Sequence, residues 1–154
     1  MPRAAIGIGS NAGDSLANVR AALARLAELG AVVARSALYR SEPWGYADQE
    51  PFVNAAASLE TALEPHALLA ALQRFEVEAG RVTTFRWGPR VLDLDILTYG
   101  ELRLADPDLV IPHARLRERA FVLVPLAEIE PRYAPLRDAL SPGERASVVE
   151  LAPQ

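Results

Sequence analysis

The first hundred residues alternate between segments of strand character and segments of helical character, and this order restricts the possible folds most. Apolar residues recur at helical spacing from Leu16 to Leu26 and from Leu68 to Val77, which predicts two helices. Segments rich in β-forming and small apolar residues predict four strands, at 4–9, 31–40, 52–61 and 91–99. The order β-α-β-β-α-β predicts an α+β fold with a ferredoxin-like core.

The rest of the chain is rich in proline and predicts short elements packed on the same core. We expect Gly100 to turn the chain into a short returning strand at 101–104, which makes a β-hairpin extension, and a helix near 116–129. The expected architecture has three layers, αβα, in a single domain over residues 1–154. Two loops, at 41–51 and 81–90, are long for a compact domain, and loops of this length are often binding loops.

Composition excludes several classes of function. The net charge is −4, so there is no basic excess for binding nucleic acid. The chain has neither cysteine nor lysine, which excludes zinc-thiolate sites, a Walker A loop and Schiff-base chemistry. No signal peptide and no span long enough for a membrane are evident. We therefore expect a cytoplasmic protein, and nothing in the sequence requires more than a monomer.

Two aspartates alternate with apolar residues in the predicted strand at 91–99. Asp93 and Asp95 are two residues apart, so a strand places both on one face, about 6–7 Å apart along the backbone. Leu92, Leu94 and Ile96 then face the core. Two like charges beside a core need compensation. Magnesium bound by both carboxylates would provide it, and the alternative is a buried salt bridge to Arg90 or Arg86.

A loop with three arginines precedes these aspartates. The loop contains Gly88 and Pro89 together with Arg81, Arg86 and Arg90. One guanidinium group can bind two phosphate oxygens at once. The loop alone could equally be a solvated basic segment, but phosphate binding is the better interpretation beside a metal site. His113 could donate to a phosphate or a sugar, although structural histidines are more frequent.

Several aromatic residues lie in or beside predicted loops rather than at core spacing. Such residues can hold a flat heterocycle between them, and Asn54 would face the same side as Phe52 with a donor and an acceptor. Taken singly, Phe52 and Phe121 could also be core residues. The aromatic residues are Trp44, Tyr46, Phe52, Trp87 and Phe121.

The string from Arg86 to Gly100 resembles the signature of the 6-hydroxymethyl-7,8-dihydropterin pyrophosphokinase family. Shorter matches in the same order extend the resemblance over nearly the whole chain. They are Gly9-Ser10-Asn11, Tyr39-Arg40-Ser41, Asn54-Ala55-Ala56, Gln73-Arg74-Phe75-Glu76 through Gly80-Arg81, and Pro112-His113 followed by Arg119 and Phe121.

The resemblance implies transfer of pyrophosphate from ATP to the hydroxymethyl group of 6-hydroxymethyl-7,8-dihydropterin, with release of AMP. It implies two Mg²⁺ ions held by Asp93 and Asp95, and charge neutralisation by Arg81 and Arg90. The implied pterin-binding residues are Ser41, Trp44, Phe52, Asn54 and Phe121. The implied nucleotide-binding residues are Gln73, Glu76, Trp87, Ile96, His113 and Arg119.

Four positions depart from the family pattern, and all four bear on ATP binding: Thr83, Asp108, Val110 and Ala114. One alternative is therefore a non-catalytic module of the same fold that binds a pterin or a nucleotide. A second is an interaction domain in which the aspartates are salt-bridged. A third, a metal-dependent hydrolase, would need a base, and neither His66 nor His113 is close in sequence to the aspartates.

Overall fold

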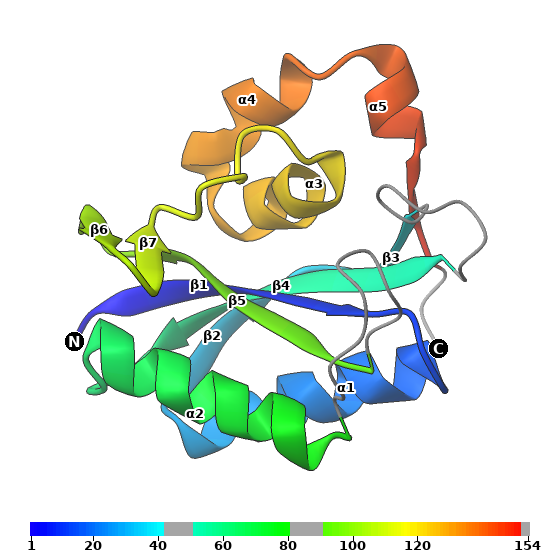
Figure 1. The fold of residues 1–154 in the computed structure, drawn as a ribbon. Helices are drawn as coiled ribbons and strands as arrows, with labels where there is room; N and C mark the ends of the chain where they lie inside the picture. The colour runs from blue at the N-terminus through cyan, green and yellow to red at the C-terminus, as the bar shows by residue number, and fades with distance from the viewer. Residues whose placement is uncertain (42–50, 81–90, 152–154) are drawn as a thin grey trace.

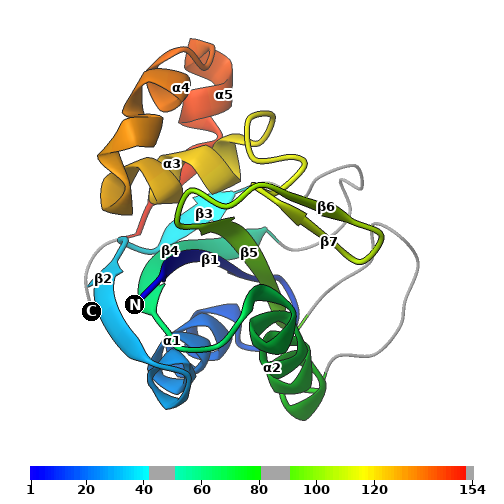
Figure 2. The same ribbon diagram turned by 90° about the vertical axis from the view of Figure 1, so that its left-hand side faces the viewer.

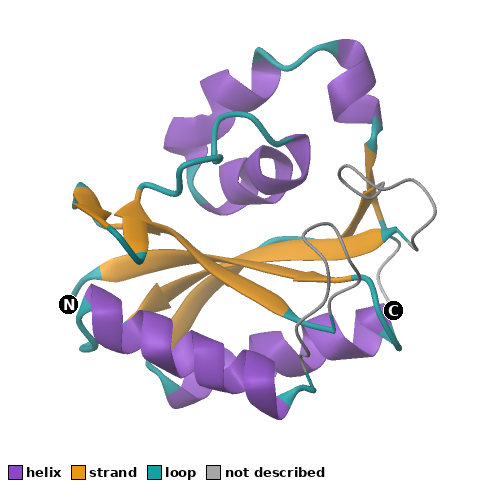
Figure 3. Cartoon of the chain, viewed as in Figure 1, coloured by secondary structure: helices purple, strands orange, loops and turns teal. Residues whose placement is uncertain are grey.

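The structure is a computed structural model that describes residues 1–41, 51–80 and 91–151. Its centre is a six-stranded antiparallel sheet (Figures 1 and 3) in the order β5-β1-β4-β3-β8, with β2 also paired to β4. The strands are β1 (Arg3–Ser10), β2 (Ala31–Arg35), β3 (Tyr39–Ser41), β4 (Phe52–Glu60), β5 (Asp93–Tyr99) and β8 (Val148–Glu150). The antiparallel sheet with helices confirms the predicted α+β class.

Helices cover both faces of the sheet (Figures 1 and 2). One face carries α1 (Ser15–Arg25), followed by the 3₁₀ turn η1 (Leu26–Glu28), and α2 (Pro65–Glu78). The other face carries α3 (Ala120–Ile129), η2 (Pro131–Tyr133), α4 (Ala134–Asp138) and α5 (Pro142–Ala146). A separate hairpin pairs β6 (Leu104–Asp106) with β7 (Leu109–Ile111). Within the described ranges, no helix is long and apolar enough to cross a membrane.

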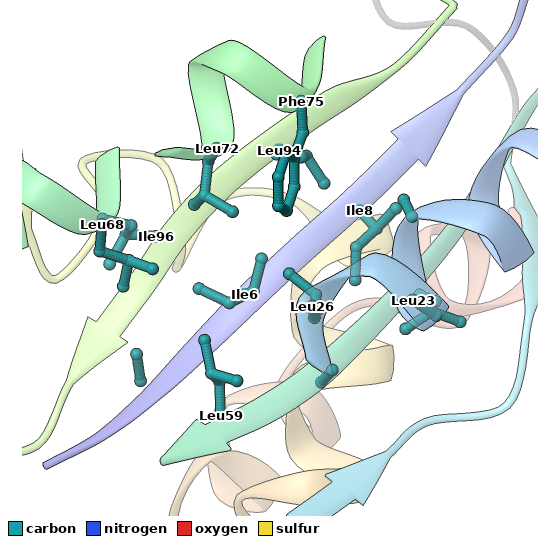
Figure 4. Packing of buried hydrophobic residues seen from close by; sticks show 14 of the residues in the cluster. Ile6, Ile8, Leu23, Leu26, Leu59, Leu68, Leu72, Phe75, Leu94 and Ile96 are labelled. Carbon is teal, nitrogen blue, oxygen red and sulfur yellow. The ribbon is translucent and has the colours of Figure 1, made fainter. Parts of the chain in front are cut away.

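The alternation of residues along the strands divides the apolar side chains between two cores. Toward α1 and α2, the strands contribute residues such as Ile6, Leu94 and Ile96, which pack with Leu72 and Phe75 of α2 (Figure 4). Toward α3, a smaller cluster contains Ala5, Leu97, Leu116, Leu123 and Leu126. Burial of a large aliphatic or aromatic side chain contributes about 1.5–3 kcal/mol, so the two cores together fix both helical layers on the sheet.

The single strand predicted at 31–40 is wrong, because the segment divides into β2 and β3. Between them, the backbone N–H of Ala37 donates to both carboxylate oxygens of Glu128 in α3, at 3.0 and 3.1 Å, rather than to a neighbouring strand. The Ser36 hydroxyl oxygen accepts from the N–H of Ala56 in β4 at 2.9 Å. Side chains therefore supply part of the hydrogen bonding at this point, in addition to the backbone bond from Ser36 N–H to Ala56 O at 2.8 Å.

Two further predicted boundaries are wrong. The strand predicted at 101–104 is replaced by the β6–β7 hairpin, and Arg132 donates to Gly100 O at 3.2 Å and Glu101 Oε1 at 2.6 Å in the turn after β5. The helix predicted from 116 begins only at Ala120. The N–H groups of Leu116 and Glu118 donate to the carbonyls three residues earlier, which gives turns rather than an α-helix.

Gly30 lies where η1 meets β2, and no side chain fits there. A Cβ atom on Gly30 would lie 2.0 Å from the Glu60 carbonyl oxygen. We expect Gly30→Ala to lower the free energy of unfolding by about 1–3 kcal/mol, because backbone atoms must shift. Urea denaturation measures this change, and Gly143→Ala in α5 is the control because its Cβ would meet nothing within 4 Å. Equal midpoints for Gly30→Ala and the unsubstituted protein would contradict the expected clash.

Candidate active site

Asp93 and Asp95 lie on the face of β5 that was predicted for them. Both are partly exposed, whereas Leu92, Leu94 and Ile96 are buried. The residues opposite the two aspartates in β1 are Gly9 and Gly7, so no neighbouring side chain of β1 crowds the carboxylates. The predicted alternation is therefore confirmed, and the two β1 residues opposite the acidic pair carry no side chain.

The two glycines of β1 are site features that the sequence interpretation did not assign. A Cβ atom on Gly9 would lie 3.1 Å from Asn54 Nδ2 and 3.6 Å from Phe52 Cδ1. Gly9 thus separates the aspartates on β5 from the polar and aromatic residues on β4. The signal that could have identified it is the pattern Gly7-Ile8-Gly9 in a buried strand, because glycine in a strand often marks a close approach.

His113 lies beside Asp95, although the two are far apart in the sequence. Its backbone N–H donates to Leu97 O at 2.9 Å, and its Nε2 lies 3.9 Å from Asp95 Oδ1. Burial, followed by the charge of Arg119, lowers the pKa of His113, and Asp93 partly opposes this effect. The imidazole is therefore neutral at pH 7 and not an ion-pair partner of Asp95.

The hydrogen bonds of His113 indicate which ring nitrogen carries the proton. The N–H of Arg115 donates to Nδ1 at 3.2 Å, so the proton of the neutral ring is assigned to Nε2. Nε2 is then a hydrogen-bond donor facing the acidic pair. A ring in this state has no free lone pair with which to abstract a proton, so its proximity to Asp95 does not make it the base that a hydrolase would need.

Arg119 brings positive charge to the same place. It directly precedes α3, and its pKa is lowered mainly by burial and then by Arg115, with Asp95 and Asp93 acting in the opposite direction. An arginine stays charged through such a shift. Its Cζ atom is 5.5 Å from the centroid of the Phe121 ring. Arg119 therefore interacts favourably both with the charge of the acidic pair and with an aromatic ring.

A pocket opens next to Asp95 and His113. Its volume is about 180 Å³, and most of its other lining residues are apolar. Asp108 also lines it and is 3.3 Å from His66 Nε2, which contacts Asp106 as well, at 3.1 Å. The remaining lining residues are Leu69, Ile96, Leu109, Val110 and Ala114. Three departures from the family pattern, Asp108, Val110 and Ala114, thus share one pocket.

Two phenylalanine rings face each other at the opposite side of the acidic pair. Phe52 in β4 and Phe121 in α3 are nearly parallel, with an interplanar angle of 6° and ring centroids 6.5 Å apart. Next to them, the Ser41 hydroxyl donates to Asn54 Oδ1 at 2.5 Å, and both residues are buried. The structure therefore brings together Ser41, Phe52, Asn54 and Phe121 from three elements.

The remaining predicted site residues differ in their placement. Gln73 is on the exposed side of α2. Glu76 is buried, and its Oε2 accepts from the backbone N–H of Leu94 at 2.8 Å. The other four fall outside the residues that the structure describes: Trp44, Arg81, Trp87 and Arg90.

Comparison with known proteins places this chain in one family. The family model for 7,8-dihydro-6-hydroxymethylpterin-pyrophosphokinase (HPPK) matches residues 5–131. The 2-amino-4-hydroxy-6-hydroxymethyldihydropteridine pyrophosphokinase of Methylorubrum extorquens is 52% identical over 133 residues, which cover 85% of this chain and 84% of the relative. The protein of the same name from Pseudomonas aeruginosa is 50% identical over 132 residues, covering 84% of this chain and 81% of the relative.

Solved structures agree on the fold. A crystal structure of HPPK-DHPS in complex with substrates aligns with a TM-score of 0.73 at 13% identity, over 90% of this chain. The wild-type HPPK-DHPS of Plasmodium falciparum aligns with a TM-score of 0.68 at 14% identity, also over 90% of this chain. This chain spans 43% of each of those longer chains. On the sequence matches over most of its length, the chain belongs to the HPPK family and is a pyrophosphokinase of folate biosynthesis.

Proposed function

We propose that this pyrophosphokinase brings its two substrates together at the exposed face of β5. The pterin would bind between Phe52 and Phe121, and the polyphosphate of ATP would lie along Asp93 and Asp95. The hydroxymethyl oxygen would form a bond to the β-phosphorus and release its proton to solvent. The bond from that phosphorus to the α,β-bridging oxygen would break, and AMP would leave with that oxygen. The observation that carries the proposal is the pair of parallel rings beside the acidic pair.

The spacing of the two rings suits a flat ligand. One aromatic ring in contact with both phenylalanines needs about 7 Å between their planes, because carbon atoms pack at about 3.5 Å on each side. The ring centroids are 6.5 Å apart, so the two rings would have to move apart slightly to admit the pterin. Asn54 Oδ1 already accepts from Ser41, which leaves the Nδ2 amide hydrogens to donate to the edge of the pterin. The backbone of Ser41 and of Trp44 would contribute further contacts at that edge.

The donor set on β5 fits magnesium. Two carboxylates on one strand face supply the oxygen ligands that Mg²⁺ prefers, and Asp93 and Asp95 would hold two such ions. Bound Mg²⁺ would neutralise phosphate charge and favour in-line displacement. His113 would donate its Nε2–H to a phosphate oxygen, and Arg119 would supply a further positive charge. Arg81 and Arg90 are proposed to neutralise the transferred group.

The pocket beside Asp95 suits one part of the nucleotide. Its volume of about 180 Å³ is below the 300–1,000 Å³ typical of pockets that enclose a whole ligand, so it would take the base and leave the phosphates outside. Ile96 and the apolar residues around it would contact the faces of the base. Gln73 and Trp87 are proposed as nucleotide contacts on the family resemblance alone. The resemblance also names Glu76, but the side chain of Glu76 contacts the backbone of β5 in the structure.

The proposal extends to the protein as a whole. We infer one domain over residues 1–154 with a ferredoxin-like core in three layers, and a cytoplasmic monomer that uses small-molecule substrates and binds neither nucleic acid nor membrane. The antiparallel sheet order and the helices on both of its faces support the domain assignment.

An assay of AMP release tests the proposed function. Protein, ATP, Mg²⁺ and 6-hydroxymethyl-7,8-dihydropterin are expected to yield AMP and the pyrophosphorylated pterin in equal amounts, because the reaction produces one of each. Omission of the pterin or chelation of Mg²⁺ should abolish AMP formation. Pterin binding without AMP would instead support the non-catalytic module, and metal-dependent ATP cleavage without pterin would support a hydrolase.

A further inference from the structure

The amide between the two aspartates has a partner outside the sheet. β5 is the end strand of the sheet order, and among the described strands only β1 pairs with it. An end strand leaves some of its N–H groups without a neighbouring strand. The N–H of Leu94 donates to Glu76 Oε2 of α2 at 2.8 Å. A helix carboxylate therefore replaces the missing strand at this position.

The contact between Glu76 and the Leu94 N–H matters for stability because Glu76 is buried. The residue is only 5% exposed and follows Phe75, a core residue of α2. A buried carboxylate is unfavourable unless hydrogen bonds compensate for its loss of water. The Leu94 N–H provides such a bond.

Leu94 is consequently held in two ways. Its side chain is 4% exposed in the core that α2 covers, and its N–H is held by Glu76. The residues on either side of it are Asp93 and Asp95. Fixing the backbone at Leu94 fixes the direction of both neighbouring side chains, because successive residues of a strand point to opposite faces.

We infer that Glu76 is a positioning residue for the aspartate pair and acts through the Leu94 amide rather than by contact with the nucleotide. This inference rests on the proposed function, in which Asp93 and Asp95 hold magnesium. Some groups do not touch the metal but orient the carboxylates that bind it. Removal of such a group lowers metal affinity or activity by about 10–100-fold. Glu76 thus raises the affinity for magnesium by orienting the two carboxylates, although its own side chain is buried in the core.

Three substitutions test this inference in the full chain. Glu76→Ala removes the acceptor and is expected to raise the Mg²⁺ concentration for half-maximal activity by about tenfold. Glu76→Gln keeps an oxygen that can accept from Leu94, so its Mg²⁺ requirement should stay within about threefold of the unsubstituted protein. Glu78→Ala is the matched control, because Glu78 is on the same helix but pairs with Arg25 at 2.6 Å on the surface.

Two measurements separate positioning from direct contact. The dissociation constant of ATP without metal, measured by calorimetry in EDTA, should be the same in Glu76→Ala as in the unsubstituted protein. Hydrogen exchange at the Leu94 amide of the metal-free protein should accelerate on the order of tenfold in Glu76→Ala and little in Glu76→Gln. The amide of Ile8, in the interior strand β1, should exchange at the same rate in all variants.

Several results would overturn the inference. One is weaker metal-free ATP binding in Glu76→Ala with an unchanged Mg²⁺ requirement, which would make Glu76 a nucleotide contact. Unchanged exchange at Leu94 would also overturn it. If Glu76→Ala does not fold, Glu76→Met fills the same space with a thioether, which is only a weak acceptor, and must also give faster exchange at the Leu94 amide. If the unsubstituted protein releases no AMP, the proposed function fails, whereas the exchange measurement still tests Glu76.

Discussion

Asp95→Ala is expected to lower Mg²⁺-dependent AMP formation by about three orders of magnitude or more while the protein folds normally. The metal stabilises transition-state charge by several kcal/mol, and each 1.36 kcal/mol corresponds to tenfold in rate. The substitution removes half of the carboxylate set proposed to bind it. Initial rates of AMP release, measured over a range of Mg²⁺ concentrations, give the size of the loss.

Folding should survive this change because Asp95 does not contribute to the core. Its side chain is 41% exposed, and the adjoining buried residues Leu94 and Ile96 hold the strand. Removal of one of two neighbouring negative charges also relieves repulsion. Urea denaturation of Asp95→Ala should therefore give a midpoint close to that of the unsubstituted protein.

Asp106→Ala is a suitable control for the loss of a carboxylate. Asp106 is in the β6–β7 hairpin and contacts His66 at 3.1 Å, and it does not line the pocket beside Asp95. Its rate of AMP release should stay within about twofold, because surface ion pairs contribute 0–1 kcal/mol. Near-normal rates for Asp95→Ala, or an equal loss in both variants, would refute the magnesium assignment.

The parts of the site that follow from local periodicity could be predicted from the sequence. Alternation in β5 correctly assigned Asp93 and Asp95 to one face and Leu94 to the core. The same rule placed Asn54 and Phe52 on a common face of β4. Such features depend only on neighbours one or two residues away, so the sequence pattern is sufficient to identify them.

Features that depend on tertiary contacts could not be predicted in this way. The approach of His113 to Asp95 depends on the β6–β7 hairpin and on the bond from His113 N–H to Leu97 O. The division of 31–40 into two strands depends on Glu128, which is provided by α3 on the far side of the sheet. Periodicity carries no information about which distant element supplies such a partner.

The role of Glu76 shows the same limit inside a correctly predicted helix. The family resemblance implies a place on the nucleotide side, and helical spacing alone cannot distinguish a residue that faces a ligand from one that faces a strand edge. The contact with the Leu94 amide became visible only when α2 and β5 were placed together. A family motif can therefore identify a functional residue and leave its physical role open.

Phe121→Ala is expected to weaken pterin binding by about 10–100-fold and to leave metal-free ATP binding within about twofold. Stacking of a flat heterocycle on one aromatic side chain contributes about 1–3 kcal/mol, and each 1.4 kcal/mol corresponds to tenfold in the dissociation constant. Phe121 forms one side of the ring pair with Phe52. Calorimetric titration with the pterin, and separately with ATP in EDTA, measures both constants.

The comparison with Phe121→Leu separates ring stacking from simple loss of apolar surface. Leucine keeps much of the volume but has no flat face, so its pterin affinity should fall between those of Phe121→Ala and the unsubstituted protein. Arg119 lies 5.5 Å from the same ring, and both substitutions remove that contact equally. If the dissociation constant of the pterin is unchanged in Phe121→Ala, the two rings are only packing partners of each other, and the pterin must bind elsewhere on the sheet.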